Sequence, residues 1–246
     1  MSEACCEAGA PVEYPYVNHG LCYTITDGTT SSSPNPLSIY VTGRSSKGIV
    51  LVPDIWGLSY SQVFYVADNF ATLGFSVAVV DIYRMNTWPY GTPPGPGIAD
   101  FIGKMDPAQI QNDIQTAVAL LKSDYGATSV GVLGFCFGAH AAFVAGQNTD
   151  NISAVAGAHP YFLENGTGMG AALKVPCAII STPDDDAKAV TDEVLAGPFA
   201  AQSVFEVYED QCHGFMAARG NFNDADVLSS VLKACRAFAD FFNNVL

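Results

Sequence analysis

A cysteine lies at the centre of a glycine-flanked motif that directly follows an apolar run. The motif reads Gly134-Phe135-Cys136-Phe137-Gly138, and the helix-forming residues Ala139-His140-Ala141-Ala142 come next. Glycines on both sides of a nucleophile permit the strained turn that presents it at the carboxyl end of a strand. There the helix N-terminus favours a thiolate, and free backbone N–H groups can receive an oxyanion. The motif predicts a nucleophilic Cys136; the alternative is a buried cysteine in an ordinary glycine-rich turn.

An acid and a histidine follow Cys136 in the chain order that is typical of α/β-hydrolases. The acid comes from Thr182-Pro183-Asp184-Asp185-Asp186, after one apolar run, and His213 comes after the next. A carboxylate that binds one imidazole nitrogen fixes the tautomer, which leaves the other nitrogen to take the thiol proton. We therefore predict a triad of Cys136, Asp184 and His213. The register leaves about one residue of slack, so Asp185 is the alternative acid, and the remaining aspartates would form a turn that caps the next helix.

Strand-like and helical patterns alternate along the chain and must position these residues. This alternation predicts a mostly parallel, doubly wound α/β sheet with helices on both faces, and chemistry at the carboxyl ends of the strands. The predicted strands are Gly48–Pro53, Phe75–Asp81, Ser129–Leu133, Ile152–Ala158, Pro176–Ser181 and Ser203–Tyr208, and the predicted helices are Ser61–Leu73, Pro107 to about Asp124, one from about Lys188, and one that contains Val227 to Phe242.

The regions outside this alternation are irregular. Residues 1–45 are expected to form an irregular segment with an edge hairpin, built from the strand-like runs Leu21–Thr26 and Ser38–Thr42 around a loop at Thr29–Pro36. The Pro/Gly-rich stretch Trp88–Gly97 predicts a long surface loop that could border a pocket.

Composition limits the class of protein. A chain of 246 residues can bury one large core, so we expect a single domain spanning residues 1–246. The formal charge of −14 opposes binding to nucleic acids and anionic membranes. Neither a leader-like pattern nor a run of about twenty apolar residues occurs, so we expect a soluble, cytoplasmic protein. The seven cysteines lack metal-site spacing, and we expect free thiols, no metal and no cofactor.

Several spaced motifs together resemble the dienelactone hydrolases (carboxymethylenebutenolidases), from about Gly48 to the C-terminus. The motifs are Val52-Pro53-Asp54-Ile55-Trp56-Gly57, Asp81-Ile82-Tyr83-Arg84, the Cys136 motif, His159-Pro160 and Cys212-His213-Gly214-Phe215-Met216. The resemblance implies an α/β-hydrolase fold, the triad roles given above, and oxyanion donors at the backbone N–H groups of Phe137 and Ile55.

The sequence departs from the family pattern at two places. Where well-studied bacterial members have a glutamate that interacts with the thiol, this chain has the shorter Asp54. Those members also hold a substrate carboxylate with two arginines. Arg84 fits the first position approximately, but Ala217 stands at the second and the nearest guanidinium is that of Arg219. The resemblance therefore implies an anion clamp of Arg84 and Arg219; the alternative is two surface arginines with acidic partners.

Two other side chains are candidates for substrate contact without a catalytic role. Tyr83 lies near a strand end, where it could line an apolar pocket, and His159 follows a strand at the end where pockets form. His159 could equally be a structural histidine.

Together these features predict a carboxylic-ester hydrolase that opens a small lactone or ester through a thioester on Cys136. The alternatives are a thiol acyltransferase or thioesterase with the same triad, and a noncatalytic binding protein that retains the fold. The sequence predicts neither the physiological substrate nor the oligomeric state.

Overall fold

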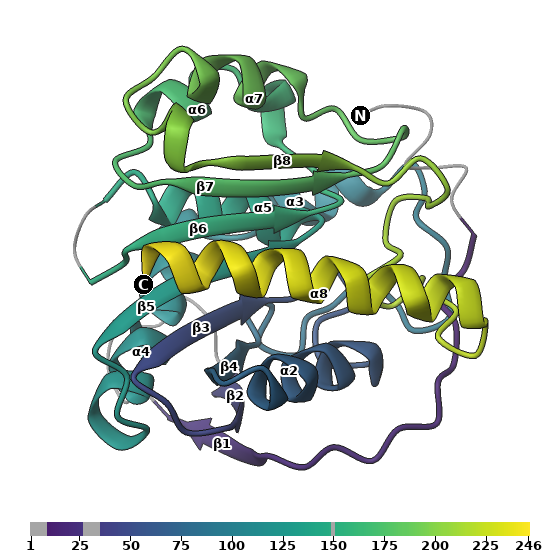
Figure 1. Cartoon of the computed structure of the whole chain (residues 1–246). Coiled ribbons are helices and arrows are strands. Elements are labelled where there is room, and N and C mark those ends of the chain that lie inside the picture. The colour runs from purple at the N-terminus through teal and green to yellow at the C-terminus, as the bar shows by residue number, and fades with distance from the viewer. Residues whose placement is uncertain (1–8, 27–34, 149–150) are drawn as a thin grey trace.

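A computed structural model describes residues 9–26, 35–148 and 151–246, and these form one eight-stranded sheet between two layers of helices (Figure 1). The strand order is β1-β2-β4-β3-β5-β6-β7-β8; β2 pairs antiparallel with β1 and β4, and the remaining pairs are parallel. The strands are β1 Leu21–Ile25, β2 Leu37–Thr42, β3 Lys47–Val52, β4 Ser76–Val80, β5 Ser129–Phe135, β6 Ala154–Ala158, β7 Cys177–Ser181 and β8 Val204–Val207. The predicted doubly wound sheet and its edge hairpin are confirmed.

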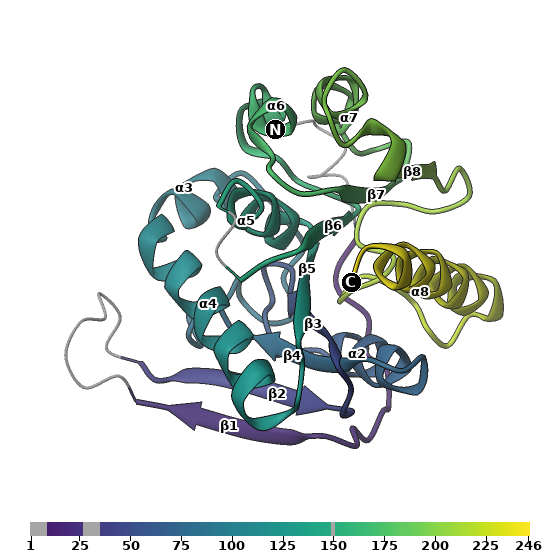
Figure 2. The ribbon, with the colours of Figure 1, turned by 60° about the vertical axis from the view of Figure 1, so that its left-hand side comes forward.

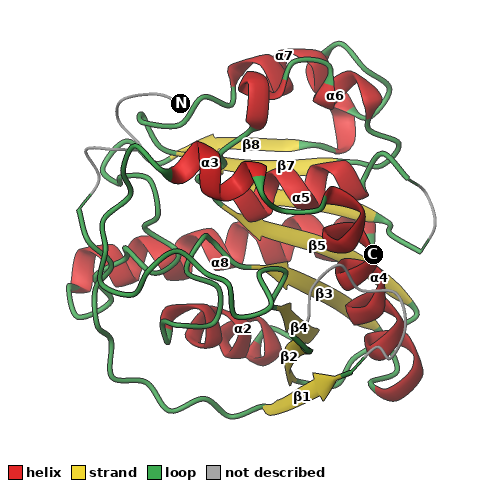
Figure 3. Ribbon diagram, turned by 180° about the vertical axis from the view of Figure 1, so that it is seen from behind, coloured by secondary structure: helices red, strands yellow, loops and turns green. Residues whose placement is uncertain are grey.

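The helices lie on both faces of the sheet and bury two apolar cores. On one face lie α3 (Ile98–Gly103), α4 (Pro107–Asp124) and α5 (Phe137–Ala145); on the other lie α2 (Gln62–Thr72) and α8 (Ala225–Val245) (Figures 1 and 3). The short helices α6 (Met169–Ala172) and α7 (Lys188–Leu195) pack together beside β7, on the same side as α5 (Figure 2). The described residues also form two 3₁₀ turns: η1 (Leu163–Gly166) precedes α6, and η2 (Ala200–Gln202) precedes β8.

Hydrophobic patterning explains the main elements. Five of the six residues of β3 are buried, as expected for a central parallel strand covered on both faces. Helix α8 buries Val231, Phe238 and Phe242 at helical spacing, so that one stripe faces the sheet. Asp106 caps α4 by accepting the Ala108 N–H, and a proline occupies the first turn of that helix.

The structure differs from the prediction mainly in short elements. Helices α3 and α6 were not predicted, because six and four residues are too few to show a helical period. The predicted strand ends agree with the structure to within two residues. Of the predicted loop Thr29–Pro36, residues 29–34 lie outside the described part of the chain, and so do Cys5 and Cys6.

Four segments that follow β3, β5, β7 and β8 meet at one edge of the sheet. Parallel strands end at the same edge, so the residues after them converge even though they are far apart in sequence. These segments carry Asp54, Cys136, Asp185 and His213.

Candidate active site

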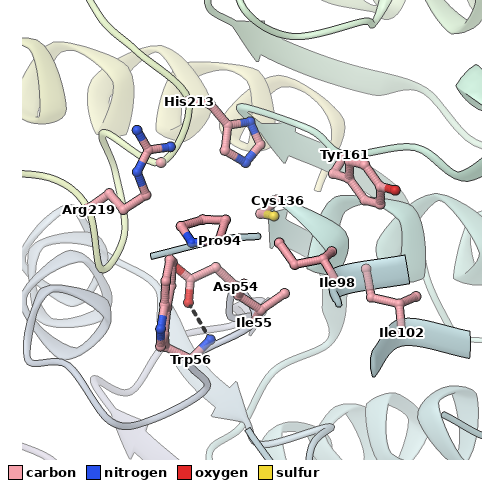
Figure 4. A pocket seen from close by; sticks show the side chains of 11 residues that line it. Asp54, Ile55, Trp56, Pro94, Ile98, Ile102, Cys136, Tyr161, His213 and Arg219 are labelled. Carbon is pink, nitrogen blue, oxygen red and sulfur yellow. Dashed lines mark hydrogen bonds between the residues drawn. The ribbon is translucent and has the colours of Figure 1, made fainter. Parts of the chain in front are cut away.

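Cys136 occupies the sharp turn between β5 and α5. Its backbone has φ 54° and ψ −121°, a conformation that is strained for a residue with a side chain. Neighbouring backbone holds it there: the Cys136 N–H donates to the Ala158 carbonyl at 3.2 Å, and the Cys136 carbonyl accepts the Tyr161 N–H at 3.0 Å. The turn presents the buried Cys136 side chain to a pocket at the end of the sheet (Figure 4).

The two glycines of the motif are required by close backbone contacts. A Cβ at Gly134 would lie 2.0 Å from the Gly138 carbonyl oxygen, and a Cβ at Gly138 would lie 2.3 Å from the Val52 carbonyl oxygen. Both distances are far inside van der Waals contact, so any larger residue would push α5 away from β3 and β5. The sequence motif therefore reflects how tightly the first turn of α5 approaches the strands.

His213 lies beside Cys136, and its partner is Asp185. The Nδ1 of His213 lies 2.5 Å from Oδ1 of Asp185, whose side chain is fully buried. Because a carboxylate only accepts, Nδ1 carries the proton, which leaves Nε2 as the unprotonated nitrogen of neutral His213. Figure 4 shows the imidazole above the Cys136 sulfur.

The carboxylate that contacts His213 is the alternative Asp185 rather than the predicted Asp184, and a turn explains why. The Asp185 N–H donates to the Thr182 carbonyl at 3.1 Å, which closes a turn directly after β7. Thr182 then donates its backbone N–H and its hydroxyl to Oδ2 of Asp185, at 2.6 and 2.9 Å. Asp184 sits at the tip of this turn and is exposed to solvent.

The two predicted oxyanion donors are available. Phe137 is the first residue of α5, so its N–H has no acceptor within the helix. Ile55 lines the pocket directly after β3, and within the described residues neither N–H donates a hydrogen bond. Both residues are therefore placed to donate to a group bound in front of Cys136.

Asp54 lines the same pocket and links two loops. Its Oδ1 accepts the Trp56 N–H at 3.0 Å, and its Oδ2 accepts the Ala218 N–H, on the loop that carries His213, at 3.1 Å. Burial raises the pKa of Asp54 from 3.8 to about 6, and these hydrogen bonds together with His213 and Arg219 oppose that rise. Asp54 is thus a buried acid that titrates near neutral pH.

Arg84 and Tyr83 do not line the pocket of Cys136. The Nε and a terminal nitrogen of Arg84 bind the two carboxylate oxygens of Asp113, at 3.1 and 2.7 Å, and both side chains are buried. Tyr83 stacks on Phe101, and its pocket is the one that Arg84 also lines. The predicted clamp therefore lacks Arg84, because its guanidinium is committed to an internal ion pair with α4.

Arg219, the other predicted clamp residue, does line the pocket of Cys136. Its Nε donates to the Gly9 carbonyl at 3.2 Å, and one terminal nitrogen lies 3.9 Å from the Cys212 sulfur. The other terminal nitrogen is buried and has no hydrogen-bond partner within the described residues. This leaves one donor beside the pocket for a bound group.

His159 packs behind His213 rather than in the pocket. The two rings meet edge to face with centroids 5.2 Å apart, and Phe135 and Phe215 complete the packing around His159. His159 is fully buried, which lowers its pKa well below the usual value, and the proximity of His213 and Arg219 acts in the same direction. The structure favours the structural alternative for this residue over substrate contact.

The remaining pocket walls are apolar, and most of them could not be identified from the sequence. They come from the turn after β3, the loop after β4, α3 and the segment after β6, and comprise Trp56, Pro94, Ile98, Ile102 and Tyr161. The sequence indicated two of them: Trp56, which lies near a strand end, and Pro94, which lies in the predicted Trp88–Gly97 loop. An apolar side chain on a short helix cannot be told from a core residue by sequence alone.

The described residues contain no group of three or more side chains suited to hold a metal ion. None of their helices combines the length and the apolar character that crossing a membrane would require.

Comparisons with known proteins identify one family model and several similar sequences. The model of the dienelactone hydrolase family matches residues 38–246. An uncharacterised AIM2 family protein of Schizosaccharomyces pombe is 27% identical over 223 residues, covering 85% of this chain and 88% of that protein. Hydrolase tropI of Talaromyces stipitatus is 23% identical over 241 residues, covering 88% and 90% respectively.

Solved structures with similar folds include two related to dienelactone hydrolases. A dienelactone hydrolase-like promiscuous phosphotriesterase from metagenomic libraries has a TM-score of 0.69 at 17% identity, covering 92% of this chain and 98% of that one. A putative dienelactone hydrolase from Klebsiella pneumoniae has a TM-score of 0.68 at 14% identity, covering 91% and 99%. These likenesses confirm the α/β-hydrolase fold.

Proposed function

This chain belongs to the dienelactone hydrolase family, and from that premise we propose that it hydrolyses a carboxylic ester or lactone with Cys136 as nucleophile, His213 as base and Asp185 as the acid that orients His213. The observation that carries the proposal is the buried contact between His213 and Asp185, beside a cysteine in a strained strand-to-helix turn. Cys136 and His213 line one pocket, and a nucleophile beside a base that an acid orients is the arrangement that activates a thiol.

The reaction proceeds in two halves. Nε2 of His213 takes the proton of the Cys136 thiol, and the sulfur attacks the carbonyl carbon to form a tetrahedral oxyanion. When this intermediate collapses, the bond to the leaving oxygen breaks, and His213 gives its proton to that oxygen. His213 then takes a proton from water, which attacks the thioester carbon and forms a second tetrahedral intermediate. When the carbon–sulfur bond breaks, His213 returns this proton to the sulfur, and the acid and the free thiol are released.

The backbone N–H groups of Phe137 and Ile55 stabilise the oxyanion in both halves. Their donors are fixed by α5 and by the turn after β3, so they need no rearrangement as charge develops. Each such donor is worth about 10²–10³ in turnover.

Arg219 supports a polar or anionic group on the substrate. One of its terminal nitrogens is buried beside the pocket without a hydrogen-bond partner in the described part of the chain, and a carboxylate would satisfy it. With Arg84 committed to Asp113, the proposed anion site has a single arginine.

The test is hydrolysis of a panel of chromogenic esters and lactones by the wild type and by Cys136→Ala. We expect turnover by the wild type and a loss of at least about 10³-fold in kcat for the variant, with an unchanged circular dichroism spectrum. Wild-type turnover in a folded Cys136→Ala variant would contradict the thiol mechanism. Binding of the panel without turnover by the wild type would instead indicate a noncatalytic protein.

A further inference from the structure

A second, larger cavity adjoins the pocket of Cys136. It lies between α3, α4 and α5, and its walls include Ile102, Met105, Ile110, Phe137, Val144 and Tyr161. Its volume is about 350 Å³, whereas that of the Cys136 pocket is about 10 Å³. The smaller space holds about one water molecule, and the larger is within the range of small-molecule sites.

Ile102 and Tyr161 line both spaces, so each separates the Cys136 pocket from this α3–α5 cavity. Phe137 also connects the Cys136 pocket with the α3–α5 cavity. Its backbone N–H is a proposed oxyanion donor, while its side chain forms part of the cavity wall. A carbonyl group held by that N–H therefore lies at the boundary between the two spaces.

The cavity is uncharged, which defines the chemistry of its occupant. Its lining contains no carboxylate, lysine or arginine. Burial lowers the pKa of His140 to about 4, so this side chain is neutral at physiological pH, and its ring stacks on Phe137. The Gln111 amide already donates to the Ala141 carbonyl at 3.1 Å. Such walls favour an apolar group.

The position of His213 decides which part of an ester enters the cavity. Because His213 must protonate the leaving oxygen, the alcohol part has to lie on the His213 side of Cys136. Figure 4 shows Arg219 on one side of Cys136 and Ile102 on the other, with Tyr161 beyond the sulfur. The acyl part of the substrate then points toward Ile102, Tyr161 and the α3–α5 cavity.

We propose that the α3–α5 cavity is an acyl subsite that selects esters of extended apolar acids, such as medium-length alkanoyl or arylalkanoyl groups. The inference rests on the proposed function. An acyl group longer than acetyl cannot fit in the Cys136 pocket as it stands, so Ile102 turns aside to admit it. Ile102 lies on α3, a helix of only six residues, and lines both spaces, so the movement is assigned to this side chain.

The experiment measures kcat/KM for p-nitrophenyl esters from acetate to octanoate. Each buried methylene favours binding about two- to fourfold, so hexanoate should exceed acetate by about 10²-fold in the wild type. Val144→Trp fills the cavity from α5 and should lower this hexanoate-to-acetate ratio at least about tenfold. Ala99 also lines the cavity, at an exposed position on α3, and Ala99→Trp should lower the same ratio. This second variant keeps the proposal testable if Val144→Trp does not fold.

Val17→Trp is the matched control, because Val17 is 83% exposed and lies outside both spaces; it should keep the wild-type ratio. Equal ratios in the wild type and both cavity variants, with hydrolysis still dependent on Cys136, would overturn the acyl subsite and leave the proposed function intact. Absence of Cys136-dependent hydrolysis for every ester would overturn both.

Discussion

At the scale of single residues, three adjacent aspartates have different surroundings because of one turn. The hydrogen bond from the Asp185 N–H to the Thr182 carbonyl reverses the chain after β7. The turn directs Asp185 back toward His213 and leaves Asp184 in solvent. Thr182 then fixes the second carboxylate oxygen with two hydrogen bonds, so Asp185 can accept from His213 in only one geometry.

Asp185→Asn should lower kcat/KM by about 10²–10⁴, because an amide at this position no longer enforces the tautomer that leaves Nε2 free to take a proton. Asp184→Asn is the matched control and should stay within about twofold of the wild type. Steady-state kinetics on a chromogenic ester gives both numbers. The assignment is wrong if Asp184→Asn has the larger effect.

Arg219 should distinguish an acidic substrate from its neutral analogue. Arg219→Met should weaken binding of a carboxylate-bearing ester by about 10–100-fold and leave its methyl ester nearly unchanged, as expected for one charge-assisted hydrogen bond. KM and inhibition constants for the two compounds measure the effect. Arg44→Met serves as control because Arg44 is exposed and donates to the Asp124 carbonyl, away from the pocket. If Arg219→Met weakened binding of the acid and of its methyl ester equally, Arg219 would not be an anion site.

At the scale of elements, a buried ion pair ties the segment after β4 to α4. Arg84 donates to both oxygens of Asp113 and also to the Asn35 carbonyl at 3.0 Å, and Gln109 donates to Asp113 at 2.8 Å. The pair therefore holds together three segments that are remote in sequence. Its contribution is structural, and Arg84 lines the same pocket as Tyr83, apart from the pocket of Cys136.

Asp113→Ala should lower the free energy of unfolding by about 3–5 kcal/mol, because it removes a buried carboxylate that accepts two hydrogen bonds from Arg84. The double variant Arg84→Met/Asp113→Leu should recover a large part of that loss, since replacing both charges with apolar groups removes the desolvation penalty. Urea unfolding of the three proteins provides the comparison. A double variant that is less stable than Asp113→Ala would show that the charge that remains on Arg84 is not the main reason for the stability lost in Asp113→Ala.

Asp54 links the turn after β3 to the loop that carries His213, and it should make stability depend on pH. Its pKa is about 6 in the folded protein, against a reference value of 3.8. Between these values the folded state binds more protons than the unfolded state, so stability falls as pH rises through the window. As pH rises from about 4 to about 7, the free energy of unfolding of the wild type should fall by up to about 3 kcal/mol more than that of Asp54→Asn.

Denaturant unfolding at several pH values tests this linkage. The asparagine side chain of Asp54→Asn does not titrate, so the free energy of unfolding of this variant should depend less on pH. This free energy should also be lower than that of the wild type by a constant amount, because the NH₂ group of the amide cannot accept one of the two backbone N–H hydrogen bonds. Asp186→Asn, at an exposed position, should run parallel to the wild type. Parallel profiles for the wild type and Asp54→Asn would exclude a linked titration of Asp54.

At the scale of the whole molecule, the sequence predicts those features of the fold and the site that a few neighbouring residues determine. The apolar strands and the Gly134–Gly138 motif can be recognised because each feature is complete within a few residues. The choice of Asp185 over Asp184 depends on a turn whose geometry the sequence leaves open by one residue. The pairing of Arg84 with Asp113 joins residues that are 29 positions apart, and no local pattern encodes it.

The pocket walls illustrate the same limit. Ile98 and Ile102 lie on a six-residue helix that has too few residues to show a period, yet they close the space in front of Cys136. His159 follows a strand as predicted, but packing against Phe135 and Phe215 places it behind His213. Tertiary packing, which the sequence pattern does not specify, therefore decides which candidates face the substrate.

The most direct test of the central claim is to trap the acyl group on Cys136. The wild type is mixed with a p-nitrophenyl ester, quenched in acid within the first turnover, and digested for peptide mass spectrometry. We expect about one acyl group per chain, on the peptide of Cys136, labile to hydroxylamine as a thioester is. Cys22 and Cys212 are exposed free thiols and report the background reaction, which Cys136→Ala should retain unchanged. Acylation confined to those thiols, or turnover with Cys136 left unmodified, would contradict a mechanism through Cys136.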